Sequence, residues 1–199
     1  CFFRYVDRKD SPRFVAQYRI QTERKRGPPM RRVAWVLGWN QLVWTPLVLV
    51  FIAWLLKLRG WEATATLPSA PRFLLMLGLL SIFSAVYFYF SHRFLHRPWW
   101  MKRVHKLHHE FRTTSAVAAE YAHWFEFVVG NFGTLAIGVI VLAPSLATIY
   151  AYTVLATTIF VVHHAGYAIP WMSWAVHHDW HHSRFTEAFG TFGHLDRWL

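Results

Sequence analysis

Long apolar runs without a formal charge dominate this chain and predict its elements. Residues 33–56 and 73–91 form two such runs, and each is close to the roughly 20 residues with which a helix crosses a bilayer. Residues 127–162 form a third, too long for one crossing and slightly short for two. Pro144 near its middle predicts a turn between two short or tilted helices. A re-entrant pair that does not cross the membrane is the alternative.

The polar segments between these runs complete the domain plan. We expect a basic segment at 1–32, a helical pair at 33–91, a polar segment at 92–126, a helical hairpin at 127–162 and a polar segment at 163–199. Hydrophobic residues make up 55% of the chain and charged residues only 16%, against about a quarter in soluble domains. The pattern therefore predicts an all-α integral membrane protein with about four transmembrane helices. Residues 1–32 lack the apolar core of a signal peptide.

The basic residues predict the orientation. With four crossings, segments 1–32, 92–126 and 163–199 share one face, and they hold 18 of the 21 Lys and Arg residues. The positive-inside rule makes that face cytosolic, so a helical, histidine-rich cap is expected there. The positive charge is concentrated in these segments and lacks interleaved stacking aromatics, so we expect no nucleic-acid partner.

Histidine gathers in three windows, "HRFLH" at 92–96, "HKLHH" at 105–109 and "HDWHH" at 178–182. On a helix, residues spaced i, i+3 and i+4 lie on one face, so each window could direct two or three ring nitrogens to a common point. One window alone is equally typical of a solvated helix face or a pH sensor. Three windows in one chain favour a metal site.

The donor set limits the metals. Cys1 is the one cysteine, so a thiolate cluster is excluded and the ligands must be nitrogen and oxygen. The number of histidines exceeds one zinc site, which takes three or four ligands, and this predicts two metal ions. Imidazole suits iron, copper, nickel and zinc alike, so ligand type alone leaves the metal open.

The windows read HxxxH, HxxHH and HxxHH, and in this they resemble the histidine boxes of the fatty acid hydroxylase superfamily, also called the sterol desaturase family. "EYAHWFE", "HHAGYAIPW" and "FGTFGHLDRWL" resemble further segments of that family, so the resemblance covers residues 92–199. The chain departs from the family pattern at Trp124, where proline is usual, and at Ala165, where serine is usual. These departures do not change the histidines, so the implied metal site is unaffected. They leave the identity of the substrate open.

The resemblance implies a non-haem di-iron oxygenase of the endoplasmic reticulum membrane. It would use O2 and electrons from NAD(P)H, delivered by cytochrome b5 or a reductase, and a purified sample could carry zinc instead of iron. By position, the implied metal ligands are His92, His96, His105, His108, His109, His164, His178, His181 and His182.

A further group of residues lies beside these positions and could orient the ligand rings or cap helices, because metal-bound histidine usually donates its other N–H to a fixed acceptor. They are Glu120, His123, His163, His177, Asp179, His194 and Asp196.

The expected function is oxidation, by hydroxylation or desaturation, of a membrane lipid, with a sterol such as a C4-methylsterol as the first candidate. Processing of fatty acids or fatty aldehydes is the alternative within the same superfamily. A histidine-rich membrane metal transporter is the alternative from another class, and it would place imidazoles along a path near the bilayer midplane.

Overall fold

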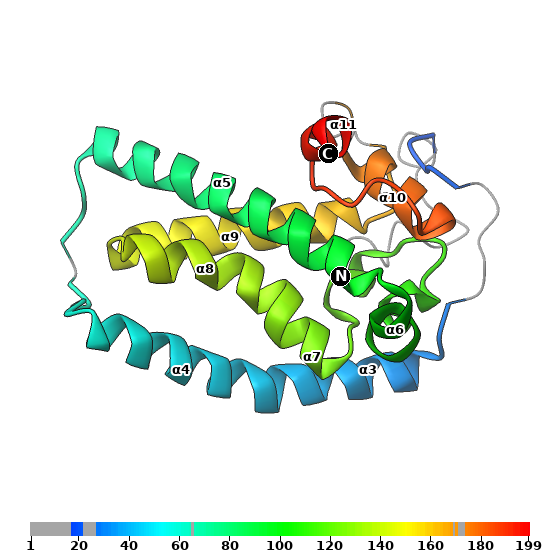
Figure 1. Ribbon diagram of the computed structural model, residues 1–199, viewed down its shortest axis with the longest axis horizontal. Coiled ribbons are helices and arrows are strands. Elements are labelled where there is room, and N and C mark those ends of the chain that lie inside the picture. Colours follow the sequence, from blue (N-terminus) through cyan, green and yellow to red (C-terminus); the bar gives the residue numbers. More distant parts are fainter. Residues whose placement is uncertain (1–16, 22–26, 65, 169, 171–173) are drawn as a thin grey trace.

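The structure is a computed structural model that describes residues 17–21, 27–64, 66–168, 170 and 174–199. Most of the predicted basic segment 1–32 therefore lies outside the described residues. Four long helical segments run roughly side by side, and short helices gather at one end of them (Figure 1).

The first helical segment is continuous but not uniform. It consists of α3 (Met30–Trp39), a π-helical turn η1 (Asn40–Trp44) and α4 (Thr45–Leu58). Pro46 sits at the start of α4 and cannot donate a backbone hydrogen bond, and the π-helical turn directly before it accommodates that loss. The segment ends at Arg59 and at Gly60, whose positive φ of 71° suits glycine.

The second segment, α5 (Ala70–Leu95), begins after Ser69 with Pro71 in its first turn and ends at His96. The apolar run predicted only residues 73–91, but the helix continues through the first histidine box. Three short elements follow before the next long helix: α6 (Pro98–Trp100), η2 (Met101–His105) and η3 (His108–Glu110). A further 3₁₀ turn, η4 (Ala116–Glu120), completes this polar segment.

The third apolar run forms two helices. The first combines α7 (Trp124–Glu126), the π-helical η5 (Phe127–Phe132) and α8 (Gly133–Leu142); the second is α9 (Leu146–His163). The chain reverses at Ala143, which adopts the left-handed conformation, and at Pro144. Ser145 then caps α9 by accepting a hydrogen bond from the Thr148 amide.

The chain ends with α10 (Trp174–Arg184) and α11 (His194–Trp198). Both lie at the same end of the bundle as α6, the start of α3 and the ends of α5 and α9, while the two connections after α4 and α8 lie at the opposite end (Figure 1). In the described residues there is no strand, only an isolated bridge between Arg19 and Tyr167. The predicted all-helical fold with a histidine-rich end is confirmed for this part of the chain.

Four helices are long and apolar enough to cross a membrane: Met30–Leu58, Ala70–Leu95, Trp124–Leu142 and Leu146–His163. They pack through a small core of Leu56, Leu80, Val139, Tyr152 and Ala156. Large apolar side chains on their outer faces remain open, such as Leu42 with 79% exposure and Val154 with 66%. Water would penalise such surfaces, whereas lipid tails would not.

The close packing of α5 against α8 predicts that a large side chain at Gly138 would destabilise the fold. A Cβ at Gly138 would lie 3.0 Å from Leu80 Cδ2 and 3.1 Å from Phe83 Cβ, whereas a Cβ at Gly78 would meet nothing within 4 Å. We expect Gly138→Leu to lower the free energy of unfolding by about 1–3 kcal/mol through overpacking, measured by denaturant titration in detergent. Gly78→Leu is the matched control and should leave it unchanged. Equal effects would contradict the packing.

Candidate metal centre

Two groups of histidines converge at the end of the bundle that carries the short helices. Within each group, one ring nitrogen per residue lies within 4.8 Å of the others. The first cluster is His92, His96, His105, His109 and His181. The second cluster is His108, His164, His178 and His182. Together they comprise the nine positions that the sequence resemblance implied.

The second and third histidine boxes each contribute residues to both clusters. In the second box, His105 and His109 belong to the first cluster, whereas His108 belongs to the second. In the third box, His181 belongs to the first cluster, whereas His178 and His182 belong to the second. Adjacent residues on a helix point about 100° apart, because a turn takes 3.6 residues. The expectation that one window serves one common point was therefore too simple for both HxxHH boxes.

Different local structures present the boxes. The first box lies in the last turn of α5, with His96 as the residue that ends the helix. The second box leaves the α-helical path: His105 ends the π-helical η2 and His108 begins the 3₁₀ turn η3. The third box lies within α10, and His164 directly follows α9. Residues far apart in sequence are thereby brought to one place.

Fixed acceptors hold most of these rings in one tautomer. In six of the nine, Nδ1 lies 2.7–3.3 Å from an oxygen, which is a backbone carbonyl in five and the Glu126 carboxylate in the sixth. A carbonyl oxygen only accepts, so Nδ1 carries the hydrogen and a neutral ring keeps its lone pair on Nε2. The six rings are those of His92, His105, His108, His164, His181 and His182.

The Nε2 atoms approach one another closely. In the second cluster, His164 Nε2 lies 3.3 Å from His108 Nε2 and 2.8 Å from His178 Nε2. In the first cluster, His105 Nε2 lies 2.9 Å from His96 Nε2 and 3.0 Å from His109 Nε2. The His108 and His164 nitrogens both carry lone pairs by the tautomer argument, so they cannot hydrogen-bond to each other.

Burial keeps the rings neutral. Eight of the nine are buried, and His96 is the partly exposed member. Burial is the main cause that lowers the pKa of His108 to about 4. Burial and the neighbouring imidazoles also lower the pKa of His178 and His182 well below the ordinary value. At neutral pH these rings therefore present lone pairs, which is the form that binds metal.

This arrangement fits metal ions. Nitrogens bound about 2.0–2.1 Å from a zinc-sized ion lie roughly 3–3.4 Å apart, and the Nε2 separations fall close to that range. A cation between converging lone pairs would remove their repulsion and satisfy the buried His181 Nε2, which has no hydrogen-bond partner among the described residues. We propose that each cluster holds one ion.

Glu126 is a site residue that the sequence reasoning missed. Its Oε1 accepts the Nδ1–H of His105 at 2.8 Å, and the carboxylate is 4% exposed. Carboxylates commonly orient metal-bound histidine in this way. The motif "EYAHWFE" contains both Glu120 and Glu126. The sequence reasoning named only Glu120 as a residue that could orient a ligand ring. Glu120 Oε2 accepts a hydrogen bond from Gln41 Nε2 at 3.1 Å, and burial raises its pKa to about 7.

Asp196 acts on a ligand through a loop rather than directly. It accepts hydrogen bonds from the Phe189 and Gly190 amides at 2.6 and 2.9 Å, and the Phe189 carbonyl in turn accepts from His92 Nδ1 at 2.8 Å. A Cβ on Gly190 would lie 2.7 Å from Asp196 Oδ2, so glycine permits this approach. His177 Nε2 lies 3.4 Å from the same carboxylate.

The other predicted neighbours hold the surrounding segments. Asp179 is buried and accepts hydrogen bonds from Thr114 and Gln21 at 2.7 and 2.8 Å, so it ties α10 to the loop after η3. His163 Nε2 donates to the Thr191 carbonyl at 3.0 Å. Neither contacts a ring of the two clusters by a hydrogen bond among the described residues.

His123 and His194 lie outside both clusters. His123 caps α7, where its Nδ1 accepts a hydrogen bond from the Phe125 amide at 3.2 Å. His194 is exposed at the start of α11. Of the seven residues predicted to surround the ligands, Asp196 reaches His92 through the Phe189 backbone, and His177 joins this path only through Asp196.

Two cavities adjoin the clusters. A chamber of 30 Å³ is lined by rings of both clusters, by Glu126 and by apolar residues that include Phe88, Leu95 and Phe160. A cleft of 550 Å³ on the other side is lined by His96 and His109 together with Lys102, Lys106 and Arg112. The first cluster thus lies between a small chamber and a basic cleft.

Comparison with known proteins agrees with this site. A family model described as fatty acid hydroxylase matches residues 77–199. The chain is 34% identical to the fatty acid hydroxylase domain-containing protein 2 of Macaca fascicularis, over 96% of this chain and 58% of that protein. It is 31% identical to the fatty acid hydroxylase ahd1 of Mycosarcoma maydis, over 98% of this chain and 51% of that protein.

A putative methylsterol monooxygenase of Dictyostelium discoideum is 34% identical over 78% of this chain and 61% of its own length. The chain therefore spans about half to three fifths of the length of these three relatives. The comparison with solved structures found no match.

Removal of one ligand from each cluster tests the pairing. We expect His181→Ala and His108→Ala each to lower the bound metal from about two ions per chain to about one, measured by mass spectrometry of the metals in purified protein. His194→Ala is the control and should retain both ions. Loss of all metal in a single variant that remains folded would show that the clusters are not separate sites.

Substitutions of Glu120 and Glu126, the two glutamates of "EYAHWFE", form a matched pair that tests whether Glu126 orients His105. Glu126→Gln should weaken metal binding at the first cluster by about 10–100-fold, because the glutamine amide holds the His105 Nδ1–H less firmly and no longer fixes the ring. Glu120→Gln should leave binding unchanged. Competition with a chelator of known affinity measures both. Equal affinities in the two variants would remove Glu126 from the site.

Proposed function

The chain belongs to the fatty acid hydroxylase family, and from that premise we propose that it oxidises a membrane lipid with two iron ions and O2. The observation that carries this proposal is the pair of histidine clusters beside a small chamber, lined by their rings together with Phe88, Leu95 and Phe160, at the ends of the long helices. All nine rings lie at one end of the bundle, whereas a transport path would distribute them along the helices.

The residues of the two clusters supply the environment for this chemistry. Bound iron would activate O2 so that one oxygen atom enters a C–H bond and the other leaves as water, with two electrons and two protons consumed. Neutral imidazoles leave the ions electron-poor, and the backbone acceptors keep each ring in position. Zinc in a purified sample would reflect its competition with ferrous iron during expression.

The chamber would exclude bulk water. Its volume of 30 Å³ is roughly that of one water molecule in the liquid. Phe88, Leu95 and Phe160 close it toward the helices, so a substrate carbon placed there would meet few competing polar groups. Glu126 and Asn131 are polar members of its wall.

The basic cleft supports a partner that delivers electrons. Lys102 and Lys106 are exposed there and form no ion pair with a described residue, and the cleft reaches the partly exposed His96. A cytochrome b5-type carrier or a reductase with an acidic surface would be attracted to it. Basic residues gathered at this end also support a cytosolic cap on an endoplasmic reticulum membrane.

Two lipid classes are candidates for the substrate. The similarity to a putative methylsterol monooxygenase favours a sterol such as a C4-methylsterol. The similarity to a fatty acid hydroxylase favours a long-chain acyl lipid. Hydroxylation is the proposed reaction for both, with desaturation as its alternative.

Isotope labelling tests the reaction. Full-length protein loaded with iron in lipid nanodiscs, supplied with ¹⁸O2 and a reducing system, should give a lipid product that carries one ¹⁸O atom, detected by mass spectrometry. His108→Ala should lower product formation by at least about a hundredfold, while His194→Ala should retain it. A product that forms without O2, or at an unchanged rate in His108→Ala, would contradict the proposal.

A further inference from the structure

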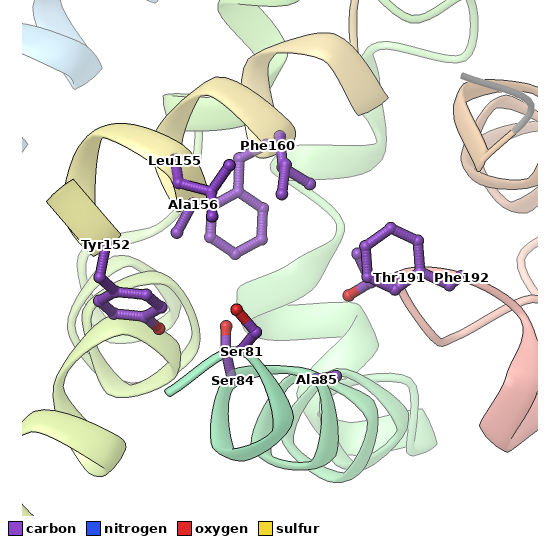
Figure 2. A pocket seen from close by; sticks show the side chains of 10 residues that line it. Ser81, Ser84, Ala85, Tyr152, Leu155, Ala156, Phe160, Thr191 and Phe192 are labelled. Atoms are coloured by element: carbon purple, nitrogen blue, oxygen red, sulfur yellow. The ribbon is translucent and has the colours of Figure 1, made fainter. Parts of the chain in front are cut away.

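A narrow slot lies between α5 and α9 within the apolar part of the bundle (Figure 2). Its volume is 70 Å³, roughly that of two water molecules in the liquid. Ser84 lies eight residues before His92 on α5, so the slot begins about 12 Å from that ring along the helix. No charged side chain lines the slot.

The slot continues toward the histidine chamber. Phe160 on α9 lines both cavities, and its ring lies 5.7 Å from the ring of Phe88, which also lines the chamber. The Phe160 carbonyl accepts a hydrogen bond from His164 Nδ1 at 2.8 Å. In Figure 2 the ring of Phe160 projects from α9 toward the middle of the slot. Phe160 therefore forms a partition between the slot and the chamber.

The hydroxyl groups in the slot do not require a polar ligand. Ser81 donates to the Leu77 carbonyl at 2.8 Å, and Tyr152 donates to the Thr134 carbonyl at 3.3 Å. These donors are satisfied within the bundle, so the slot presents mainly hydrocarbon to an occupant. Leu155 in its wall is 44% exposed, which leaves the slot open toward the surrounding lipid.

A larger apolar groove of 380 Å³ lies between α4 and α8, and Tyr87 is part of its lining. Tyr87 donates to the Val129 carbonyl at 2.9 Å, and a Cβ on Gly133 would lie 2.5 Å from its hydroxyl. The side chain is therefore pressed against the helix backbone. The groove and the chamber share no lining residue among those described.

We propose that the slot binds the unbranched alkyl chain of the lipid substrate, which enters from the bilayer between α5 and α9 and passes Phe160 to reach the chamber. This inference rests on the proposed function, because it places the substrate of that reaction. The alkyl chain would be either the acyl chain of a long-chain lipid or the side chain of a sterol whose ring system lies outside the slot.

Two exposed leucines provide a matched pair of variants. Leu155 lines the slot, and Leu47 lines the groove between α4 and α8 with 56% exposure. A tryptophan at either position fills one cavity with little disturbance of the core. With iron-loaded protein in nanodiscs, Leu155→Trp should lower kcat/KM for the accepted lipid by about tenfold or more. Leu47→Trp should stay within about twofold, and both variants should keep the metal content of the unaltered protein.

Turnover of two sets of lipids distinguishes an acyl lipid from a sterol as the source of the alkyl chain. If an acyl lipid is the substrate, the effect of Leu155→Trp should grow with acyl length. If a sterol is the substrate, the effect should appear with the intact sterol and disappear with one whose side chain is truncated. Loss of turnover in Leu47→Trp with unchanged turnover in Leu155→Trp would overturn the proposal in favour of the groove.

A binding measurement keeps this inference separate from the proposed reaction. A fatty acid with a terminal photoreactive diazirine should label peptides of α5 and α9 in the unaltered protein, and Leu155→Trp should reduce that labelling severalfold. Mass spectrometry of the peptides needs no turnover. Labelling without lipid oxidation would leave the slot assigned and contradict the reaction, whereas oxidation with labelling confined to α4 and α8 would contradict the slot.

Discussion

The structure depends on the convergence of neutral imidazole nitrogens in a buried space. Backbone carbonyls accept the Nδ1 hydrogens of His108 and His164, so their Nε2 lone pairs face each other at 3.3 Å. Such an arrangement is repulsive unless a cation lies between the rings. The metal binding proposed for the clusters would therefore be coupled to folding of this end of the bundle, because the binding energy would offset the cost of burying the rings together.

Several segments that look unrelated in sequence serve this convergence. The loop around Phe189 supplies a carbonyl to His92 and is itself fixed by Asp196 at the start of α11. Asp179 ties α10 to the loop whose Phe111 carbonyl accepts from His182. α11 thus helps to position His92 without contributing a histidine to either cluster, whereas α10 contributes His178, His181 and His182.

The apolar runs predicted the long helices, and the repeated spacings pointed to the eight histidines of the three windows, because both are local signals. His164 was implied only by the family resemblance, since it lies in none of the windows. The sequence did not predict how the HxxHH boxes divide, since this depends on the π-helical and 3₁₀ turns around His105 and His108. The role predicted for Glu120 stays a prediction, whereas Glu126, which the sequence reasoning did not name, contacts His105. Both glutamates occur in one motif, and only the direction of the chain after α7 decides that Glu126 contacts His105 while Glu120 contacts Gln41.

The two clusters differ in what surrounds them, and this bears on how electrons would enter. His92 and His105 of the first cluster line the chamber, whereas its His96 and His109 line the basic cleft. The second cluster reaches the chamber but contributes no ring to the cleft. An electron carrier docked at Lys102 and Lys106 would therefore meet the first cluster before the second. A lipid arriving between α5 and α9 would meet both from the opposite side, so the donor and the substrate need not compete for one surface.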